Sequence, residues 1–212
     1  MQGLIGKKLG MTQVYDGNGH RVAVTMIEAG PCLIVQRKTK ATDGYDAVQI
    51  GFGSIKEKQT SKAMAGHFKK AAVDLKAHLC EMAVDAAETA KAGDALNLAV
   101  FDGVKFVDVS GLTKGKGFQG VVRRYGMRGG PMTHGGHSKR RIGSIGSNSY
   151  PARVHRGHRM PGHQGQVPVV QQNLRIVEMR PDQNMMLVEG AIPGAVGSIV
   201  VVRKAIKKTG KI

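Results

Sequence analysis

Tryptophan is absent from this chain of 212 residues, and aromatic residues make up only 4% of it. A platform of stacked aromatic side chains, of the kind that binds the bases of single-stranded nucleic acid, is therefore a poor fit to the sequence. Cysteine is scarce as well: Cys32 and Cys80 are too few for a disulfide framework, and they do not by themselves form a zinc site. This usage is typical of a reduced, intracellular protein.

Long apolar runs are also missing. The longest, residues 191–202, has only 12 residues and contains Pro193, Gly194 and Gly197, whereas about 20 apolar residues are needed to cross a bilayer. The first residues, MQGLIGKK, include no apolar stretch long enough for a signal peptide. We therefore expect no membrane insertion and no membrane partner.

Acidic residues are missing from a third of the chain. Asp108 and Glu178 are consecutive carboxylates, so residues 109–177 contain none, although the same 69 residues hold 12 Lys and Arg. The other 143 residues hold 20 basic and 15 acidic groups, so most of the formal net charge of +17 comes from the acid-free stretch. A surface this basic attracts polyanions, and nucleic acid is the expected partner.

Glycine is abundant, at 30 of 212 residues against a usual share of about 7%. Residues 111–165 combine many glycines with a lack of strong hydrophobic periodicity, so this stretch cannot bury a continuous apolar face. A free loop of that length is uncommon inside a compact domain. We interpret residues 112–166 as an extension that a polyanionic partner orders, in preference to a disordered linker, because linkers seldom exclude acids so completely.

The sequence on either side of this extension is apolar enough for a core and contains many short runs of β-forming residues. Turn signals predict hairpins around residues 16–19 and 102–103 and a further turn at residues 181–184. The runs cover residues 11–15, 21–28, 32–37, 47–52, 95–101, 104–109, 167–179, 185–189 and 198–203. Many short strands joined by turns indicate an all-β barrel or sandwich.

Residues 61–90 are the exception, because their Ala, Lys, Leu and Met content favours one or two helices. Apolar residues at helical spacing are interpreted as two core-facing stripes: Met64, His67, Phe68 and Ala71, then Leu75, Leu79 and Met82. The fold class is therefore mainly β with a small α insertion. We expect a β-barrel core in residues 1–56, 94–111 and 167–212, a helical insertion in residues 57–93, and a basic, glycine-rich extension in residues 112–166.

Residues 115–120, GKGFQG, spell a dinucleotide-binding fingerprint, but their context contradicts that interpretation. A dinucleotide site needs a long helix at the glycines and an acidic residue about 20 positions later, and the next acid here is Glu178. The Asp residues that a kinase needs downstream are missing too. The glycines instead allow backbone amides to approach phosphate closely, with Lys114 and Lys116 beside them. We expect no enzyme, no cofactor and no small-molecule substrate.

Five histidines lie in the acid-free stretch, and four of them form pairs at HxxH spacing: His134 with His137, and His155 with His158. Such spacing can bind a metal, but no cysteine or carboxylate accompanies the pairs, and the surrounding Arg and Lys would repel a cation. Contacts with phosphate or 2′-hydroxyl groups are favoured over a metal site. A metalloenzyme and a general, histone-like nucleic-acid-binding protein stay open as competing classes.

Several distinctive sequence blocks follow one another along essentially the whole chain: residues 3–12 (GLIGKKLGMT), 114–121 (KGKGFQGV), 143–146 (GSIG), 159–165 (RMPGHQG) and 190–194 (GAIPG). Together they resemble the bacterial-type family of the large-subunit ribosomal protein L-three. The resemblance implies a translation-protein-type β-barrel, a structural role in the large ribosomal subunit and a cytoplasmic location in the ribosome. It also implies that the protein binds 23S ribosomal RNA early in assembly, and that the extension threads through this RNA and braces it near the peptidyl-transferase centre.

The same resemblance implies contacts with the neighbouring large-subunit proteins L-fourteen and L-nineteen, and it puts the tip of the extension at residues 147–151. Four positions depart from the family's usual residues: Tyr125 replaces Trp, Ile142 replaces proline, Ser149 replaces a glutamine that many members methylate, and Ala152 replaces glycine. Charge and resemblance together predict contacts with ribosomal RNA at Lys114, Lys116, Arg123, Arg124, Arg128, His134, His137, Lys139, Arg140, Arg141, Asn148, Arg153, Arg156, Arg159 and His163.

Overall fold

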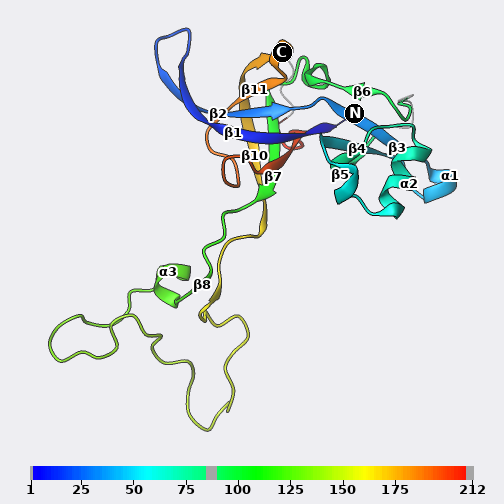
Figure 1. Cartoon of the computed structure of the whole chain (residues 1–212). Helices are drawn as coiled ribbons and strands as arrows, with labels where there is room; N and C mark the ends of the chain where they lie inside the picture. Colours follow the sequence, from blue (N-terminus) through cyan, green and yellow to red (C-terminus); the bar gives the residue numbers. More distant parts are fainter. Residues whose placement is uncertain (1, 85–89, 209–212) are drawn as a thin grey trace. The chain divides into compact units, whose positions relative to one another are not determined.

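The computed structural model describes residues 2–84 and 90–208 and divides the chain into two compact units (Figure 1). The first unit comprises residues 1–112 and 168–212, and the second comprises residues 113–167. The bounds of the second unit differ by one residue at each end from those of the extension expected at residues 112–166. Within the described residues, no helix has the length and apolar character needed to span a membrane.

A closed antiparallel barrel dominates the first unit and confirms the mainly β class (Figure 1). Its strands follow the order β1-β12-β7-β10-β11-β2, and every neighbouring pair is antiparallel. The strand bounds are Gly3–Tyr15 (β1), Arg21–Ala29 (β2), Phe106–Leu112 (β7), Pro168–Arg180 (β10), Met185–Glu189 (β11) and Ile199–Lys204 (β12). The pairing of β1 with β12 closes the barrel, so each of these strands has a neighbour on both sides over at least part of its length.

Two of the predicted turns are confirmed. Between β1 and β2, the Asp16 carboxylate accepts hydrogen bonds from the backbone N–H groups of Asn18 and His20, at 3.0 and 2.8 Å. An aspartate that binds the backbone of its own turn specifies the chain reversal locally. Between β10 and β11, the chain reverses through a 3-10 helix, Pro181–Gln183 (η3), in which proline supplies the required backbone angle.

A second sheet of four strands lies in the same unit, in the order β5-β4-β3-β6. Its strands are Cys32–Lys38 (β3), Ala47–Ser54 (β4), Lys76–Ala83 (β5) and Ala95–Leu96 (β6). The prediction that β3 and β4 belong to the barrel is therefore wrong. A short apolar run indicates that a strand exists, whereas its partners depend on contacts between distant residues.

The helical prediction for residues 75–82 is also wrong. β5 pairs with β4 along its length, with Cys80 opposite Ile50, because tertiary pairing overrides the weak helix propensity of this segment. The hairpin predicted at residues 102–103 is wrong for a related reason. β6 pairs with β3 instead of β7, and a 3-10 helix, Leu98–Phe101 (η2), follows it with both end residues buried.

The insertion does contain one regular helix, α2, at Lys62–Lys70. Ser61 begins the helix, because its Oγ accepts a hydrogen bond from the Met64 N–H at 3.4 Å. Phe68 is 1% exposed and anchors α2 in the core, whereas Met64 is 37% exposed, so only part of the predicted stripe faces inward. Two shorter helical segments are Lys40–Asp43 (α1) and Glu57–Gln59 (η1).

The barrel and the second sheet share one hydrophobic core. On β12, Val200 and Val202 are almost fully buried, and Arg203 is exposed, which is the alternation expected of a strand with one face in a core. Lys8 is also buried, and its Nζ donates hydrogen bonds to the carbonyl oxygens of Ile192 and Gly194 at 2.9 and 3.0 Å. These bonds to a charged donor hold the loop before β12 against β1.

Candidate nucleic-acid interface

The second unit begins and ends in a two-stranded stem, defined here as residues 113–119 and 162–167. Phe118–Gln119 (β8) pairs antiparallel with Gly162–His163 (β9). Backbone hydrogen bonds continue the pairing: the Lys116 N–H donates to the Gln164 oxygen at 2.8 Å, and the Thr113 N–H donates to the Val167 oxygen at 3.0 Å. Backbone groups thus hold the stem together, while most of its side chains stay exposed.

Glycine allows the two halves of the stem to approach closely. Gly165 has a φ of +79°, in the left-handed region, and a Cβ at this position would overlap with the carbonyl oxygen of Lys114. A residue with a side chain would therefore be strained here and would push the strands apart. The glycine content that excludes a packed core in this stretch is thus used to form a narrow ribbon.

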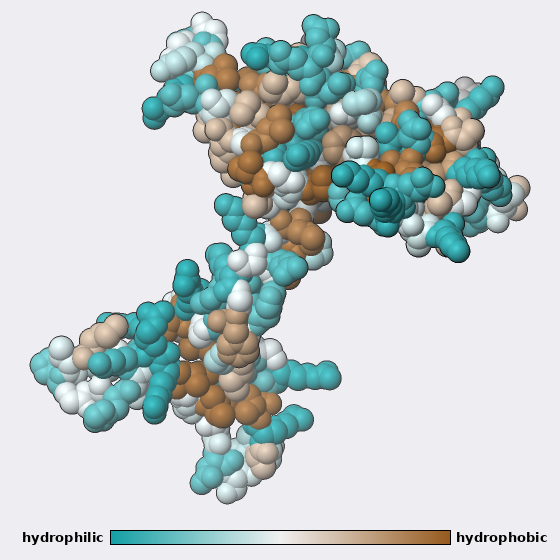
Figure 2. All heavy atoms as spheres, in the orientation of Figure 1, coloured by the Kyte–Doolittle hydropathy of each residue, from teal (hydrophilic) through white to brown (hydrophobic). Residues whose placement is uncertain are grey.

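A short helix, Val121–Tyr125 (α3), follows the first half of the stem. Val121 is 2% exposed and forms a small apolar centre, and Figure 2 shows hydrophilic residues projecting around apolar ones in this unit. Arg124 crosses from α3 to the segment before β9, where its Nη1 donates a hydrogen bond to the carbonyl oxygen of Met160 at 2.8 Å. Arg124 therefore serves the unit's own structure, a role that its charge alone does not reveal.

Two arginines lie over the ring of Tyr125. The guanidinium carbon of Arg124 is 5.0 Å from the ring centroid, and that of Arg159 is 5.8 Å from it. The cation–π contact with Arg159 links α3 to a residue that is distant in the sequence. Tyr125, where the resemblance implies a tryptophan, is thus in contact with cations of this chain, although the residue remains 39% exposed.

Beyond α3, residues 126–161 form long loops without a helix or strand (Figure 1). The Gly130 N–H donates a hydrogen bond to the Lys139 oxygen at 2.8 Å, and most of the other hydrogen bonds in these loops lie within single turns, such as that from Ser144 Oγ to the Gly146 oxygen at 2.9 Å. No hydrophobic cluster of the described residues includes a side chain from these loops. Most of their side chains are exposed to solvent, as a surface that meets a partner would require.

The predicted contact residues are exposed with one exception, the half-buried Arg124. Within the part of the chain that the structure describes, no salt bridge involves any of their cations. The exposed residues are Lys114, Lys116, Arg123, Arg128, His134, His137, Lys139, Arg140, Arg141, Asn148, Arg153, Arg156, Arg159 and His163. The acid-free sequence thus becomes a surface of cations without internal counter-charges.

Arg175 belongs to the acid-free stretch by sequence but not to this surface. It lies in β10 of the barrel, and its Nε donates to Oε2 of Glu189 on β11 at 2.6 Å. Antiparallel pairing of β10 with β11 brings the two residues together. One of the 12 cations counted in residues 109–177 is therefore neutralised within the first unit.

The histidines of the second unit do not gather into one cluster of ligands. Among the described residues, no group of three or more His, Cys, Asp and Glu side chains is arranged to hold a metal ion. His134 and His137 are exposed, and His158 is half-buried with an Nε2 that lacks a hydrogen-bond partner among those residues. The chemistry these side chains offer is that of hydrogen-bond donors and acceptors.

The structure brings together two predicted residues at the expected tip. Asn148 and Arg153 line one shallow hollow of about 310 Å³, together with Ile145 and Ser147. An amide and a guanidinium that line the same hollow can together donate several hydrogen bonds to phosphate or base edges. The five-residue separation of Asn148 and Arg153 in the sequence gives no direct sign that they meet.

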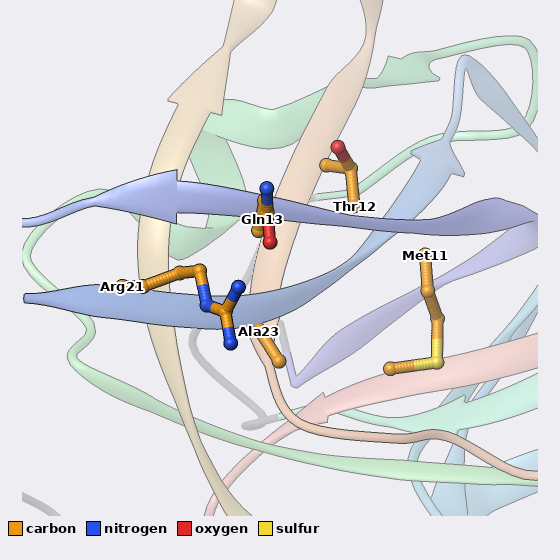
Figure 3. A pocket seen from close by; sticks show the side chains of 5 residues that line it. All are labelled: Met11, Thr12, Gln13, Arg21 and Ala23. Carbon is orange, nitrogen blue, oxygen red and sulfur yellow. The ribbon is translucent and has the colours of Figure 1, made fainter.

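The first unit has an open hollow of about 580 Å³ on the β1–β2 hairpin (Figure 3). Its lining side chains, Met11, Thr12, Gln13, Arg21 and Ala23, are spread along two neighbouring strands and do not converge on one point (Figure 3). A catalytic site needs a nucleophile, acid or base held close to a second functional group. This lining provides no such pair.

Cys32 is the buried nucleophile candidate of the first unit. Burial raises the pKa of its thiol to about 11, and Sγ donates a hydrogen bond to the Ile5 oxygen at 3.3 Å. A thiol that stays protonated at neutral pH is a poor nucleophile. Cys32 therefore contributes to packing between β1 and β3.

A group of cations in the first unit was not predicted from the sequence. Arg37 in β3 and Lys70 at the end of α2 line one hollow, with His67 beside them. The sequence carries a weak signal for it, because residues 62–70 (KAMAGHFKK) contain three lysines and no acid. Core-facing periodicity in the same segment obscured that signal.

The fold and this surface define a class: a structural β-barrel protein that carries a cation-rich extension with little internal packing. Comparisons with known proteins specify the family. The model of the family described as Ribosomal protein L3 matches residues 35–184. The chain belongs to the ribosomal protein L3 family, which confirms the resemblance of the sequence blocks. Members are structural proteins of the ribosome, a family not known as enzymes.

Three relatives illustrate the extent of the similarity. Large ribosomal subunit protein uL3 of Brachyspira hyodysenteriae (strain ATCC 49526 / WA1) is 50% identical over 211 residues, covering 100% of this chain and 97% of that protein. The protein of the same name from Brachyspira pilosicoli is 47% identical with the same coverage. That of Corynebacterium jeikeium (strain K411) is 46% identical over 208 residues, covering 98% of this chain and 95% of that protein.

Proposed function

We propose that residues 113–167 bind 23S ribosomal RNA early in subunit assembly and brace this RNA near the peptidyl-transferase centre. As a member of its family, the chain is a structural constituent of the large ribosomal subunit and is located in the cytoplasm as part of the ribosome. The observation that carries the proposal is the acid-free surface of the second unit, whose cations have no internal counter-charges.

Counterion release explains how this surface would bind. Folded RNA holds phosphates close together, and their mutual repulsion opposes compaction. Lys and Arg side chains that approach the phosphates displace condensed counterions, which favours binding at low salt. The guanidinium of arginine is planar and can bind a phosphate through two hydrogen bonds or stack on a base. Of the 11 Lys and Arg in residues 113–167, seven are arginines other than Arg124, which is bound within the unit itself.

The backbone geometry supports a role inside RNA. The stem is only two strands wide, and hydrogen bonds between backbone groups hold it. The loops beyond α3 lack a hydrophobic core of their own, so an RNA partner would meet the cost of ordering them. Such a ribbon can follow a narrow gap between RNA helices, where a globular domain would not fit.

The neighbours implied by the resemblance are part of the proposal. We expect the chain to contact the large-subunit proteins L-fourteen and L-nineteen in the assembled particle. Similarity along the full length of the relatives supports a shared position in the subunit.

The test measures binding of the purified full chain to a 23S ribosomal RNA transcript as salt is raised. If 6–10 phosphates are neutralised, the affinity should fall by roughly 10³–10⁵ between 50 and 200 mM salt. An affinity that does not respond to salt would contradict the mechanism. Equal affinity for duplex DNA of random sequence would favour the histone-like alternative instead.

Sedimentation of cell lysate provides the cellular counterpart. The tagged chain should remain in the large-subunit peak of a sucrose gradient after a high-salt wash. Release to the top of the gradient would indicate a loosely attached basic factor.

A further inference from the structure

We propose that a hollow in the first unit, lined by Arg37, His67 and Lys70, binds a phosphate group of ribosomal RNA. The hollow has a volume of about 300 Å³ and lies between β3 and the end of α2, with Gln36 and Ala71 among its other lining residues. At about 30 Å³ per water molecule, it has room for a phosphate and several waters. The site lies outside the extension, and the choice of RNA as its partner rests on the proposed function.

Arg37 supplies the strongest argument for an anionic ligand. Its side chain is 19% exposed, and its Nη2 is 3.9 Å from Oδ1 of Asp46, at the outer limit of an ion pair. Its Nη1 is buried and has no hydrogen-bond partner among the described residues. Arg37 lines the hollow and its Nη2 has only the long contact with Asp46 within the described part of the chain, so an oxyanion in the hollow would give the accessible part of the guanidinium the acceptor it prefers.

His67 and Lys70 complete the site from α2. They are three residues apart, which places them on the same side of a helix. The His67 Nε2 is 2.7 Å from Oε1 of Gln49, which fixes the orientation of the imidazole ring. Lys70 is exposed, so its flexible ammonium group can reach an anion that enters from solvent.

The charge balance of the hollow also favours an anion. None of its described lining residues carries a carboxylate, and Asp46 meets Arg37 only through the long contact already described. The site therefore presents positive charge without a close negative neighbour in its lining.

The open hollow favours a phosphate attached to RNA over free phosphate. Its charged donors are two long side chains, so a free anion would be held weakly. Once the extension binds, RNA presents its phosphates to the first unit at a high effective concentration, which makes a weak individual contact useful.

The first test compares Lys70→Gln with Lys69→Gln in the full chain. Both lysines are exposed, adjacent and on α2, but only Lys70 lines the hollow. Lys70→Gln should weaken binding to the 23S ribosomal RNA transcript several-fold and reduce the slope of log affinity against log salt by about 0.7–0.9, the value for one phosphate contact. Lys69→Gln should retain the original slope. Equal effects of the two substitutions would overturn the proposal.

The second test is acetylation of lysines in free chain and in assembled large subunits, read by mass spectrometry. Lys70 should be protected in the subunit more than Lys69, and Lys114 and Lys116 report on the extension independently. Protection of the extension without protection of Lys70 would overturn this inference and leave the proposed function standing, whereas protection of neither would overturn both. Protection of Lys70 in free chain by millimolar inorganic phosphate alone would assign the hollow to free phosphate and overturn the RNA assignment.

Discussion

Gly165 illustrates how a single residue controls the shape of the extension. Its positive φ and its close approach to the Lys114 oxygen leave no room for a side chain. Gly165→Ala should therefore destabilise the stem by roughly 1–3 kcal/mol, the cost of a strained backbone. Hydrogen exchange measures the effect, because the backbone amides of Lys116 and Gln164 should exchange faster once the stem opens.

Gly120→Ala is the matched control for that substitution. Gly120 has an ordinary φ of −69°, and a Cβ there would lie in open space. Its replacement should leave the exchange of the stem amides almost unchanged. If both variants exchange at the same rate, the glycine at position 165 is not the constraint that shapes the stem.

Arg124 and Arg123 are adjacent and identical in charge, yet the structure gives them different roles. Arg124→Ala removes the bond to the Met160 oxygen and a cation over Tyr125, so local opening around α3 should become easier by about 1.5–3 kcal/mol. Among the described residues the exposed Arg123 makes no corresponding contact, and its replacement should change the free energy of local opening by no more than about 0.5 kcal/mol. Limited proteolysis of the free chain between residues 120 and 128 distinguishes the two variants, and equal cleavage would contradict the role given to Arg124.

At the scale of elements, an ion pair with an added hydrogen bond links two strands of the second sheet. Nζ of Lys38 on β3 is 2.6 Å from Oε1 of Glu81 on β5, and the Tyr45 hydroxyl donates to the other carboxylate oxygen at 2.7 Å. The Lys38 ammonium and the Tyr45 hydroxyl lower the pKa of Glu81 below its ordinary 4.5, and the bond to Glu81 raises the pKa of Lys38. The ionised carboxylate of Glu81 and the protonated ammonium of Lys38 are thus both favoured in the folded protein.

The sign of the pH effect follows from these directions. A carboxylate whose pKa is lower in the folded state stabilises the fold above about pH 4.5, and this contribution is lost as the pH falls through the folded-state pKa. Denaturant unfolding should therefore show a decline in stability below about pH 4.5 that is smaller in Glu81→Gln. The side chain of Glu81 is 36% exposed, so the effect should be small and should weaken with salt.

Glu57→Gln provides the comparison. Glu57 lies exposed in η1 and forms no salt bridge within the described residues. This variant should keep the acid decline of the original chain. If the stability of Glu81→Gln depends on pH in the same way as that of Glu57→Gln, the ion pair between Lys38 and Glu81 does not contribute to stability.

The elements that could be predicted from sequence are those specified by neighbouring residues. The turn after β1 is formed by Asp16 bonding to its own loop, and Pro181 begins the turn after β10, so both signals lie within a few residues. The errors fall where partners are distant. Pairing of Cys80 with Ile50 makes a strand of a segment with helical composition, and pairing of β6 with β3 removes a predicted hairpin.

The same division applies to the candidate site. Charge and the absence of acids indicated the extension, because composition is visible without structure. The internal bond of Arg124, the pairing of Arg175 with Glu189 and the hollow at Arg37 depend on contacts between residues far apart in the chain. Composition identifies where cations are concentrated, and tertiary contacts determine which of them remain available to a partner.

At the scale of the whole molecule, the division into two units predicts that assembly and folding can be separated. Arg123, Arg140 and Arg141 are exposed in the second unit, which contributes no residue to the hydrophobic core described for the first. Replacing all three with Ala should impair formation of large subunits, because the proposed contacts of these arginines with phosphate would be lost. The melting temperature of the free chain should change by no more than about 2 °C, since exposed substitutions rarely alter stability by more than about 0.5 kcal/mol.

A matched variant shows whether position or net charge matters. Lys56, Lys58 and Lys62 are exposed cations of the first unit outside the proposed phosphate hollow, and their replacement with Ala removes the same total charge. Sucrose gradients of cells that depend on each variant should show a deficit of large subunits for the arginine variant and near-normal subunits for the lysine variant. An equal deficit would mean that net charge drives assembly. Normal assembly with the arginine variant would mean that these three cations form a solvated surface, and the extension would then need another means of binding RNA.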